Sequence, residues 1–497
     1  MQDEKSVLEE NYRTYAKRWL VLGSVVICNL SGALIWLTFT AVPYPTVEYY
    51  NTDLATVNGL SLVFMISAIP VGAVATIVLE KYGLKPALLI SAWLTAIGGG
   101  LRIISVIESI PPTGKIALLF VGQTICALGQ PFTMYAPAKT ASTWFADDQR
   151  TLANTFASVA NPVGVVIAGL VSPTFVSSTT GELDMLNLLI TMAVPAAAGA
   201  VYTTCVMTSG EPPLPPSAGG DKTKKEVFGK GIKEVLRNKD YMILVLTVGG
   251  GIGLYSTFAT LLAQLLCPFG YTNTMAGVCS AVLTGTGVLG AAIIGTYCDI
   301  TKQFSSTVKV CYVITTIGII IFSCTFHYNM GYLVLILITG IGLFSFGIYP
   351  IGVELGAECT YPVGSATTSG LIMISGQLQS IILIFILQSI GSPMTAEQVN
   401  YYDSKCHYVS DEVLTTTYTT PSDVTELSSV AMATATAAVQ PITYDMSVSV
   451  YVCTAYIGIL CIALLGFFRP KYHRMKAEQH AISDNISQCS TSNITAV

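Results

Sequence analysis

The sequence predicts an all-α polytopic membrane protein in which twelve transmembrane helices form two halves of six. The first indication is composition, because 52% of the 497 residues are hydrophobic and only 11% are charged, whereas soluble chains carry about 25% charged residues. The second is a set of twelve apolar segments, each near the length of about 20 residues that a bilayer-spanning helix needs. The third is a polar, basic connector at 208–239, which leaves six segments on either side.

The first half, residues 19–207, follows a polar N-terminal tail at 1–18. Its first apolar run begins behind Lys17 and Arg18 and is too long for the hydrophobic region of a cleaved signal peptide, so we expect a retained helix. The spans predicted here are 19–46, 54–79, 84–107, 115–138, 151–175 and 186–207.

The second half, residues 240–468, follows the connector and precedes a polar C-terminal tail at 469–497. Its predicted spans are 240–267, 274–298, 306–327, 330–353, 361–390 and 448–468. The last two spans are separated by a long polar loop at 391–447, whereas the other loops within the halves are short.

The distribution of basic residues predicts the orientation of the chain. Lys and Arg are enriched in short cytoplasmic loops, and an N-terminus inside the cell places all but three of the 24 basic residues in cytoplasmic segments. The exceptions are Arg102, Lys115 and Lys405. We therefore expect an integral multi-pass protein with both termini in the cytoplasm. The plasma membrane is the default location.

The long loop at 391–447 is rich in Ser and Thr, and this topology places it outside the cell or in a lumen. It contains Cys406, and Cys267 lies at the outer end of the seventh predicted span. Two thiols that face an oxidising compartment can form a disulfide bond. We therefore hypothesise a disulfide bond that tethers the loop, and the alternative is two free thiols.

An internal repeat with a spacing of about 216–219 residues relates the two halves. Glu80 follows the second span and precedes Lys81, and Asp299 follows the eighth span and precedes Lys302. An acid at such a helix end can form a salt bridge or cap a neighbouring helix, and such links can break when the halves rock. The duplicated pattern resembles the signature loop of the major facilitator superfamily, whose substrates bind between the halves near the midplane.

Three further charged residues are expected to belong to the same cytoplasmic gate. Glu354 and Glu358 lie four residues apart at the end of the tenth span, and Lys139 ends the fourth span at nearly the equivalent position of the repeat. We favour a network of gating ion pairs over a proton site. Because no Asp or Glu occupies the middle of a predicted span, we expect facilitated transport by alternating access.

A longer resemblance narrows the family. The stretches 122–130 (GQTICALGQ), 161–164 (NPVG) and 354–370 (ELGAECTYPVGSATTSG) are similar to the feline leukaemia virus subgroup C receptor-related family, solute carrier family 49, and most similar to its third-member branch. The resemblance covers about residues 15–390 and the last span. It implies transport of choline and ethanolamine, which other members carry out. Haem export has also been proposed for the family.

The resemblance also implies a substrate site. The family's choline site is an aromatic cage with a Trp from the first helix and a Tyr from the seventh, which correspond to Trp36 and Tyr255. Aromatic faces suit a quaternary ammonium, which has no N–H donor, and each contributes ~0.5–2 kcal/mol. A glutamine of that site corresponds to Gln377, and its partner in the repeat is Asn161. The alternative role for the two aromatic residues is helix packing or anchoring at the membrane interface.

The sequence departs from this family pattern at one point, where Asn161-Pro162 stands in place of the Asn-Gln of the choline transporters. Pro162 removes a hydrogen-bond donor, which puts choline specificity in question. Other amides inside spans, including Gln123 and Gln264, are expected to hydrogen-bond between helices. Arg102, near the outer end of the third span, is expected to extend toward the interface.

We therefore predict a carrier for a small organic cation or amine such as choline or ethanolamine. One alternative is a haem or porphyrin carrier of the same fold that depends on Cys267 or His327, and another is a non-transporting receptor or scaffold. The sequence contains no nucleotide-binding loop, nucleophile triad or metal-ligand cluster, so we expect no enzyme activity, cofactor or bound metal. The expected partners are the substrate and the lipid bilayer, without nucleic acid, and the monomer is expected to be functional.

Overall fold

The structure is a computed structural model, and the chain is described here only in part. The described residues are 13–146, 149–176, 183–214, 216, 235–301, 303–328, 330–360, 365–390, 392–393, 444–445 and 447–469. Most of the predicted connector at 208–239 and of the predicted loop at 391–447 lies outside them, as do the tails at 1–12 and 470–497.

Twelve of the described helices are long and apolar enough to cross a membrane, which confirms the predicted fold class. Those of the first half are α2 (Lys17–Trp36), α4 (Leu54–Lys81), α5 (Leu84–Ile104), α6 (Pro112–Met134), α8 (Arg150–Val171) and α9 (Met185–Val206). Those of the second half are α11 (Lys239–Leu266), α12 (Asn273–Thr301), α13 (Phe304–Thr325), α14 (Gly331–Thr360), α15 (Ser365–Ile390) and α19 (Ser447–Phe467).

Short elements connect these helices. They are the α-helices α3 (Pro43–Tyr50) and α7 (Ala136–Trp144), the 3-10 turns η1 (Ser172–Phe175), η2 (Cys267–Phe269) and η3 (Phe326–Tyr328), and the strands β1 (Ser392–Pro393) and β2 (Tyr444–Asp445). The two strands pair antiparallel where the chain leaves α15 and enters α19.

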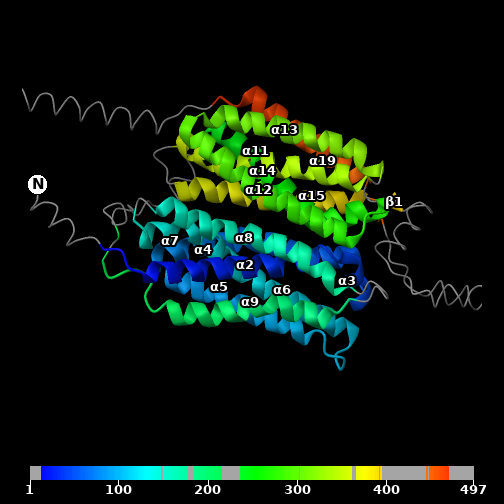
Figure 1. The fold of residues 1–497 in the computed structure, drawn as a ribbon, viewed down its shortest axis with the longest axis horizontal. Coiled ribbons are helices and arrows are strands. Elements are labelled where there is room, and N and C mark those ends of the chain that lie inside the picture. The colour runs from blue at the N-terminus through cyan, green and yellow to red at the C-terminus, as the bar shows by residue number, and fades with distance from the viewer. Residues whose placement is uncertain are drawn as a thin grey trace, which may run out of the picture.

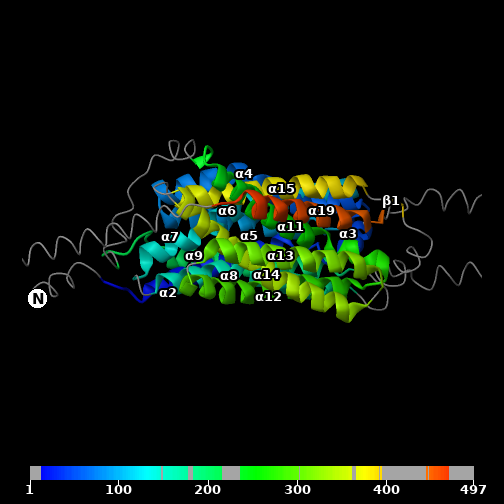
Figure 2. The ribbon, with the colours of Figure 1, turned by 90° about the horizontal axis from the view of Figure 1, so that it is seen from above.

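The two halves lie side by side with their helices along the long axis of the molecule (Figure 1). After a quarter turn (Figure 2) the two halves overlap in the view, the helices still run along the long axis, and α7 lies at one end of the bundle while α3 and β1 lie at the other. We call these the α7 end and the α3 end. The start of α2 lies at the α7 end, where Lys17 Nζ donates to Thr208 Oγ1 after α9 over 2.5 Å.

Several long helices begin with a side-chain cap. Asp53 Oδ1 accepts from the Thr56 backbone N–H over 2.7 Å at the start of α4, and Asn238 Oδ1 accepts from Tyr241 N–H over 3.2 Å at the start of α11. These oxygens satisfy backbone donors that have no partner within the first helical turn.

The first apolar run is not one helix, so the predicted span 19–46 was wrong at its end. Helix α2 stops at Trp36, a turn follows, and α3 begins at Pro43. Proline lacks an N–H and disfavours a helical conformation in the residue before it, and Val42 accordingly has φ −134° and ψ 49°. Trp36 is therefore the last residue of its helix rather than an interior one.

The halves contact each other mainly through α8 with α12 and through α4 with α15. The closest approach of α8 and α12 is at Gly169 and Gly277, where a Cβ on Gly277 would lie 2.2 Å from the Gly169 carbonyl oxygen. Small residues allow membrane helices to approach closely, so glycine is required at this contact.

Within each half, a different pair of helices packs most closely. In the first half α5 meets α6 at Gly98 and Gly122, where a Cβ on Gly98 would lie 2.4 Å from the Gly122 carbonyl oxygen. In the second half α12 meets α14, where a Cβ on Gly342 would lie 2.4 Å from the Leu283 carbonyl oxygen. The two halves therefore share a plan of helices but not their internal packing.

Candidate functional site

Trp36 lies at the boundary between the halves. It is half-buried and packs against the large hydrophobic cluster in which Leu62 and Met65 of α4 join residues of the second half, and against two clusters made mostly of first-half residues. Its indole Nε1 is buried and has no hydrogen-bond partner in the described part of the chain. The structure thus places an aromatic ring and an unused donor at the seam of the molecule, at the point where α2 ends.

Tyr255 lies in the middle of α11 and is also half-buried. Its hydroxyl shares a 2.9 Å hydrogen bond with Thr284 Oγ1 on α12, and its ring packs edge-to-face on Phe346 with centroids 4.7 Å apart. Ala259, one turn along the same face of α11, packs in a hydrophobic cluster of the first half. Tyr255 and Trp36 make no ring contact with each other among the described residues.

Asn161 is tied to the helix that carries Trp36. Its Nδ2 donates to the Asn29 carbonyl oxygen on α2 over 3.5 Å. The Asn29 side chain in turn donates to the carbonyl oxygens of Thr133 and Ala157 over 3.2 and 3.3 Å. The neighbouring Pro162 lies inside α8. Asn161 therefore helps to fix α2, α6 and α8 to one another, and its amide oxygen is left to accept from a ligand.

Gln377 lies on α15 and is half-buried, and its side chain has no hydrogen-bond partner within the described residues. The amide network of this helix belongs instead to Gln379, which sequence reasoning missed. Gln379 Nε2 donates to Ser375 Oγ over 2.8 Å, and its Oε1 accepts from the Tyr456 hydroxyl on α19. The sequence does contain this second glutamine, but its spacing alone gives no reason to separate the packing amide from the free one.

A pair of amide side chains forms hydrogen bonds between the halves. Asn58 Nδ2 on α4 donates to Gln264 Oε1 on α11 over 3.1 Å, and Gln264 Nε2 donates to Asn58 Oδ1 over 2.5 Å. Both side chains are buried, with exposed fractions of 3% and 1%. The expected interhelical role of Gln264 is confirmed, whereas its partner Asn58 was missed because a single polar residue at the start of a span has no distinguishing pattern.

This amide pair lies near the α3 end, because Asn58 is close to the start of α4 and Gln264 is close to the end of α11. The Gly169–Gly277 contact lies toward the same end, near the finish of α8 and the start of α12. The halves are therefore joined at the α3 end by a hydrogen-bonded pair and by direct backbone contact.

The predicted gating residues are described unevenly. Glu80 and Asp299 lie in the last turns of α4 and α12, but their side chains fall outside the described part of the structure. Lys139 on α7 is half-buried, Glu354 on α14 is exposed, and Glu358 is buried with 5% exposure. Both glutamates have interaction partners. A shared gate of these five residues remains a prediction.

Cys267 follows α11 in η2, is fully buried and is disulfide-bonded. Cys406, its predicted partner, lies outside the described residues. In contrast, Cys28, Cys126 and Cys205 of the first half are free. A covalent link at the α3 end is thus present in the second half.

Arg102 does not extend toward the interface as expected, since only 1% of it is exposed. Its guanidinium lies over the Phe39 ring with 5.1 Å to the centroid, and its Nε and Nη2 have no hydrogen-bond partner among the described residues. The contact with Phe39, in the turn after α2, holds the side chain inside the half instead.

Among the described residues, no group of three or more His, Cys, Asp or Glu side chains could hold a metal ion. The described residues form a seam between two helical halves with aromatic and amide side chains, which can bind a solute.

The chain is similar to known transporters along most of its length. Residues 25–384 match the family described as Major Facilitator Superfamily. The chain is 36% identical over 471 residues to solute carrier family 49 member A3 of Xenopus tropicalis, which covers 94% of this chain and 90% of the relative. It is 27% identical over 394 residues to the choline/ethanolamine transporter flvcr2b of Danio rerio, which covers 76% of this chain and 80% of the relative.

The fold is also that of solved transporters. The crystal structure of a D-xylose-proton symporter superposes with a TM-score of 0.62 at 12% sequence identity and covers 91% of this chain and 98% of that one. A bacterial homologue of the lysosomal transporter Spinster superposes with a TM-score of 0.58 at 13% identity and covers the same shares. The protein is thus a multi-pass membrane transporter and not an enzyme, and it belongs to the major facilitator superfamily and, within it, to solute carrier family 49.

Proposed function

We propose that this protein carries a small organic cation or amine, such as choline or ethanolamine, across its membrane by alternating access. The observation that supports the proposal most directly is the position of Trp36, an aromatic residue with an unpartnered indole N–H at the seam between the halves. A quaternary ammonium offers no N–H donor and is bound best by aromatic faces. The hydroxyl group of choline, like that of ethanolamine, can form hydrogen bonds with amide groups.

Each proposed site residue has a separate role. Trp36 offers its ring to the cation, and Tyr255 does the same because its hydroxyl is already bonded to Thr284. Asn161 and Gln377 have free amide atoms that suit the substrate hydroxyl or an ammonium N–H. The two substrates then differ in how their nitrogen is bound. The methylated nitrogen of choline packs on the ring faces of Trp36 and Tyr255, and the N–H donors of ethanolamine bind the amide oxygens of Asn161 and Gln377.

The mechanism follows from the scarcity of charge. The acidic residues of the described spanning helices lie near helix ends, as with Asp240, Asp299 and Glu358. A proton-coupled carrier usually places a carboxylate within the membrane. We therefore propose facilitated transport in which the membrane potential drives a cation inward, at about 2.3 kcal/mol per charge per 100 mV. The amide pair at the α3 end would close the outer side, and the acids at the α7 end would belong to the inner gate.

The haem alternative is not supported by the residues on which it depends. Cys267 is in a disulfide bond, so it has no thiolate for iron. The His327 ring lies in η3 against Phe269 and Phe326, with centroids 4.8 and 3.8 Å away.

The proposal is tested by uptake of labelled choline and ethanolamine into cells that express each variant at equal surface level. Trp36→Ala is expected to lower choline uptake about tenfold or more, since each aromatic contact with a cation contributes up to ~2 kcal/mol. Trp36→Phe should retain part of the uptake because it keeps a ring. Tyr255→Phe should retain nearly all of it, because only the ring is proposed to contact the cation.

The chain offers a matched control in Trp93 on α5, which is 46% exposed and donates its Nε1–H to Thr204 Oγ1 over 3.1 Å. Trp93→Ala should leave uptake unchanged. If wild type takes up neither compound above background, the proposed substrate class is wrong. Equal losses in the Trp36 and Trp93 variants would remove the proposed role of Trp36.

A further inference from the structure

The second half contains a chamber that shares Tyr255 with the proposed substrate site but is lined by none of Trp36, Asn161 and Gln377. It has about 630 Å³ of empty space, part of which is open to the surroundings, and lies among α11, α13 and α14, with single residues contributed by α12 and α19. Every residue that lines it belongs to the second half. It is therefore a cavity within one helical bundle rather than a gap between the two.

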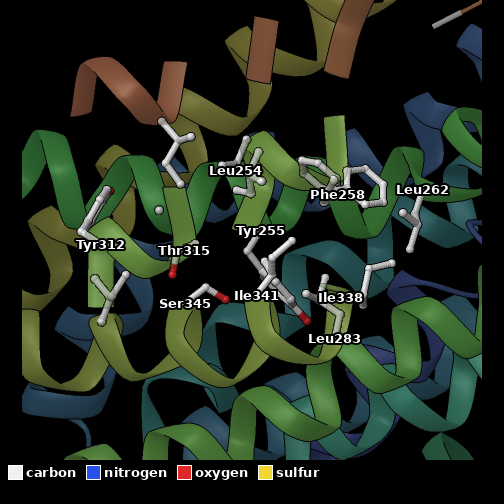
Figure 3. Close-up of a pocket in the computed structure, with 15 residues that line it drawn as sticks. Leu254, Tyr255, Phe258, Leu262, Leu283, Tyr312, Thr315, Ile338, Ile341 and Ser345 are labelled. Carbon is white, nitrogen blue, oxygen red and sulfur yellow. The ribbon is translucent and has the colours of Figure 1, made fainter. Parts of the chain in front are cut away.

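The chamber is elongated and differs in polarity between its ends (Figure 3). It follows α11 from Gly251 to Leu262, which spans roughly 16 Å at the helical rise. The hydroxyls of Thr315 and Ser345 lie at one end and the ring of Phe258 lies at the other, and the Phe322 ring packs edge-to-face on that of Phe258. The lining residues include no Asp, Glu, Lys, Arg or His.

Thr315 is the residue that indicates a ligand. It is 2% exposed, and its Oγ1 is buried with no hydrogen-bond partner among the described residues. Its neighbour Thr316 donates to the carbonyl oxygen four residues earlier over 2.7 Å, as many helical threonines do. An unpartnered buried hydroxyl is unfavourable and in native proteins usually has an unobserved partner.

The first half shows why this space exists. Aligning α13 with α5 and α14 with α6 by their first residues pairs Gly318 with Gly98 and Ile341 with Gly122. In the first half these glycines let α5 and α6 touch, whereas in the second half a Cβ on Gly318 would already lie 2.9 Å from Ile341 Cγ1. The bulk of Ile341 holds α14 away from α13. Thr95, aligned with Thr315, is fully bonded and donates to the Ser91 carbonyl oxygen over 2.8 Å.

We propose that this chamber binds an uncharged, ring-containing molecule with one hydroxyl group. The hydroxyl would bond to Thr315, and the rings would pack at the end formed by Phe258 and Phe322, whose centroids are 6.3 Å apart. The chamber suits an uncharged molecule better than a cation such as choline, because no acidic residue lines it to pair with a charge. Water can satisfy Thr315, but the apolar end offers no polar partner for it. The inference does not depend on the proposed substrate.

The test compares 4-phenylphenol with biphenyl, which has the same two rings without the hydroxyl. The purified protein is placed in lipid nanodiscs, and its thermal unfolding is followed as each compound is added. We expect 4-phenylphenol to raise Tm by several degrees in a saturable manner. Biphenyl should bind about 3- to 10-fold more weakly because it lacks one hydrogen bond.

Three variants separate binding in the chamber from general effects on the bilayer. Thr315→Val keeps the shape and should abolish the preference for 4-phenylphenol. Ser345→Leu fills the chamber and should abolish the shifts with both compounds, and Ile341→Phe is a second filling variant if the first does not fold. Thr95→Val, at the aligned position of the first half, should respond like wild type.

The proposal is overturned if the filled variants keep the wild-type shifts, because the compounds would then act elsewhere. It is also overturned if Thr315→Val keeps the preference, or if wild type shows no saturable shift with either compound. Since the readout is unfolding rather than uptake, a failure here leaves the proposed transport untouched.

Discussion

The two halves of this transporter follow one plan of helices but differ inside. In the first half α5 and α6 meet at Gly98 and Gly122, so that backbone touches backbone. In the second half the aligned helices are kept apart at Ile341, and a chamber with an unpartnered Thr315 hydroxyl lies beside them. The difference teaches that the repeat determines where helices run, whereas the volume of a few side chains determines whether a half is solid or hollow.

The halves also differ in charge at one aligned pair of positions. Phe39 and Arg102 form a cation–π contact in the first half, and the residues about 220 positions later, Phe258 and Phe322, form a ring pair in the second. A buried cation in one half therefore corresponds to an apolar wall of the chamber in the other.

The largest effect is expected from exchanging these residues. Phe322→Arg puts a cation at the apolar end of the chamber, where no acceptor lines the wall, and should destabilise the protein by about 3–5 kcal/mol. Arg102→Phe removes guanidinium nitrogens that have no partner among the described residues and should be neutral or stabilising. Thermal unfolding of purified variants measures both. Equal destabilisation by the two changes would show that Arg102 has a compensating partner.

The next largest effect concerns the disulfide bond of Cys267. If Cys406 is its partner, the bond tethers the loop at 391–447 to the second half, and either Cys→Ser change should cost about 2–4 kcal/mol. The variant with both changes should lose no more stability than either single variant. Unfolding with and without reductant measures this, and Cys489→Ser in the C-terminal tail is the control. If Cys489→Ser lowers the stability and Cys406→Ser does not, Cys267 has a partner other than Cys406.

A smaller effect should distinguish the two glycine positions. Gly98→Ala places a Cβ 2.4 Å from both the Cys126 Sγ and the Gly122 carbonyl oxygen, and such overpacking costs about 1–3 kcal/mol. Gly318→Ala meets only the Ile341 side chain, whose Cγ1 would lie 2.9 Å away, and should cost about 1 kcal/mol, the low end of that range, because no backbone atom has to move. Equal costs in thermal unfolding would contradict the proposed difference in packing.

The sequence predicted the outline of the fold better than the interior of the site. The number of spans follows from apolar length, which is a local property, and Gln264 was correctly expected to bond between helices. The end of α2 at Trp36 was missed because the apolar run continues through the turn, and the break comes from Pro43 and its effect on Val42. The chamber was missed because its space depends on side chains of several helices that the chain brings together only on folding.

The smallest effect is expected from the amide pair that joins the halves. Asn58→Ala and Gln264→Ala should each cost about 1 kcal/mol, and the double-mutant cycle should give a coupling near the ~0.6 kcal/mol that is typical within membranes. Loss of the pair should also open this end to water. A cysteine introduced beside the pair should then react faster with a water-soluble thiol reagent. Additive losses, or unchanged labelling, would show that this pair does not hold the α3 end closed.

The contact of Gly169 with Gly277 has a consequence for how the halves can move. At this point the two glycine backbones meet directly, and the nearest side-chain atoms are those of the small residues Ser280 and Pro173, so the two backbones can turn against each other with little rearrangement of side chains. Such a contact is a pivot, because it fixes the distance between the halves while it leaves their relative angle free. A methyl group on Gly277 would lie 2.2 Å from the Gly169 carbonyl oxygen, so it would push the two helices apart and restrict their rotation.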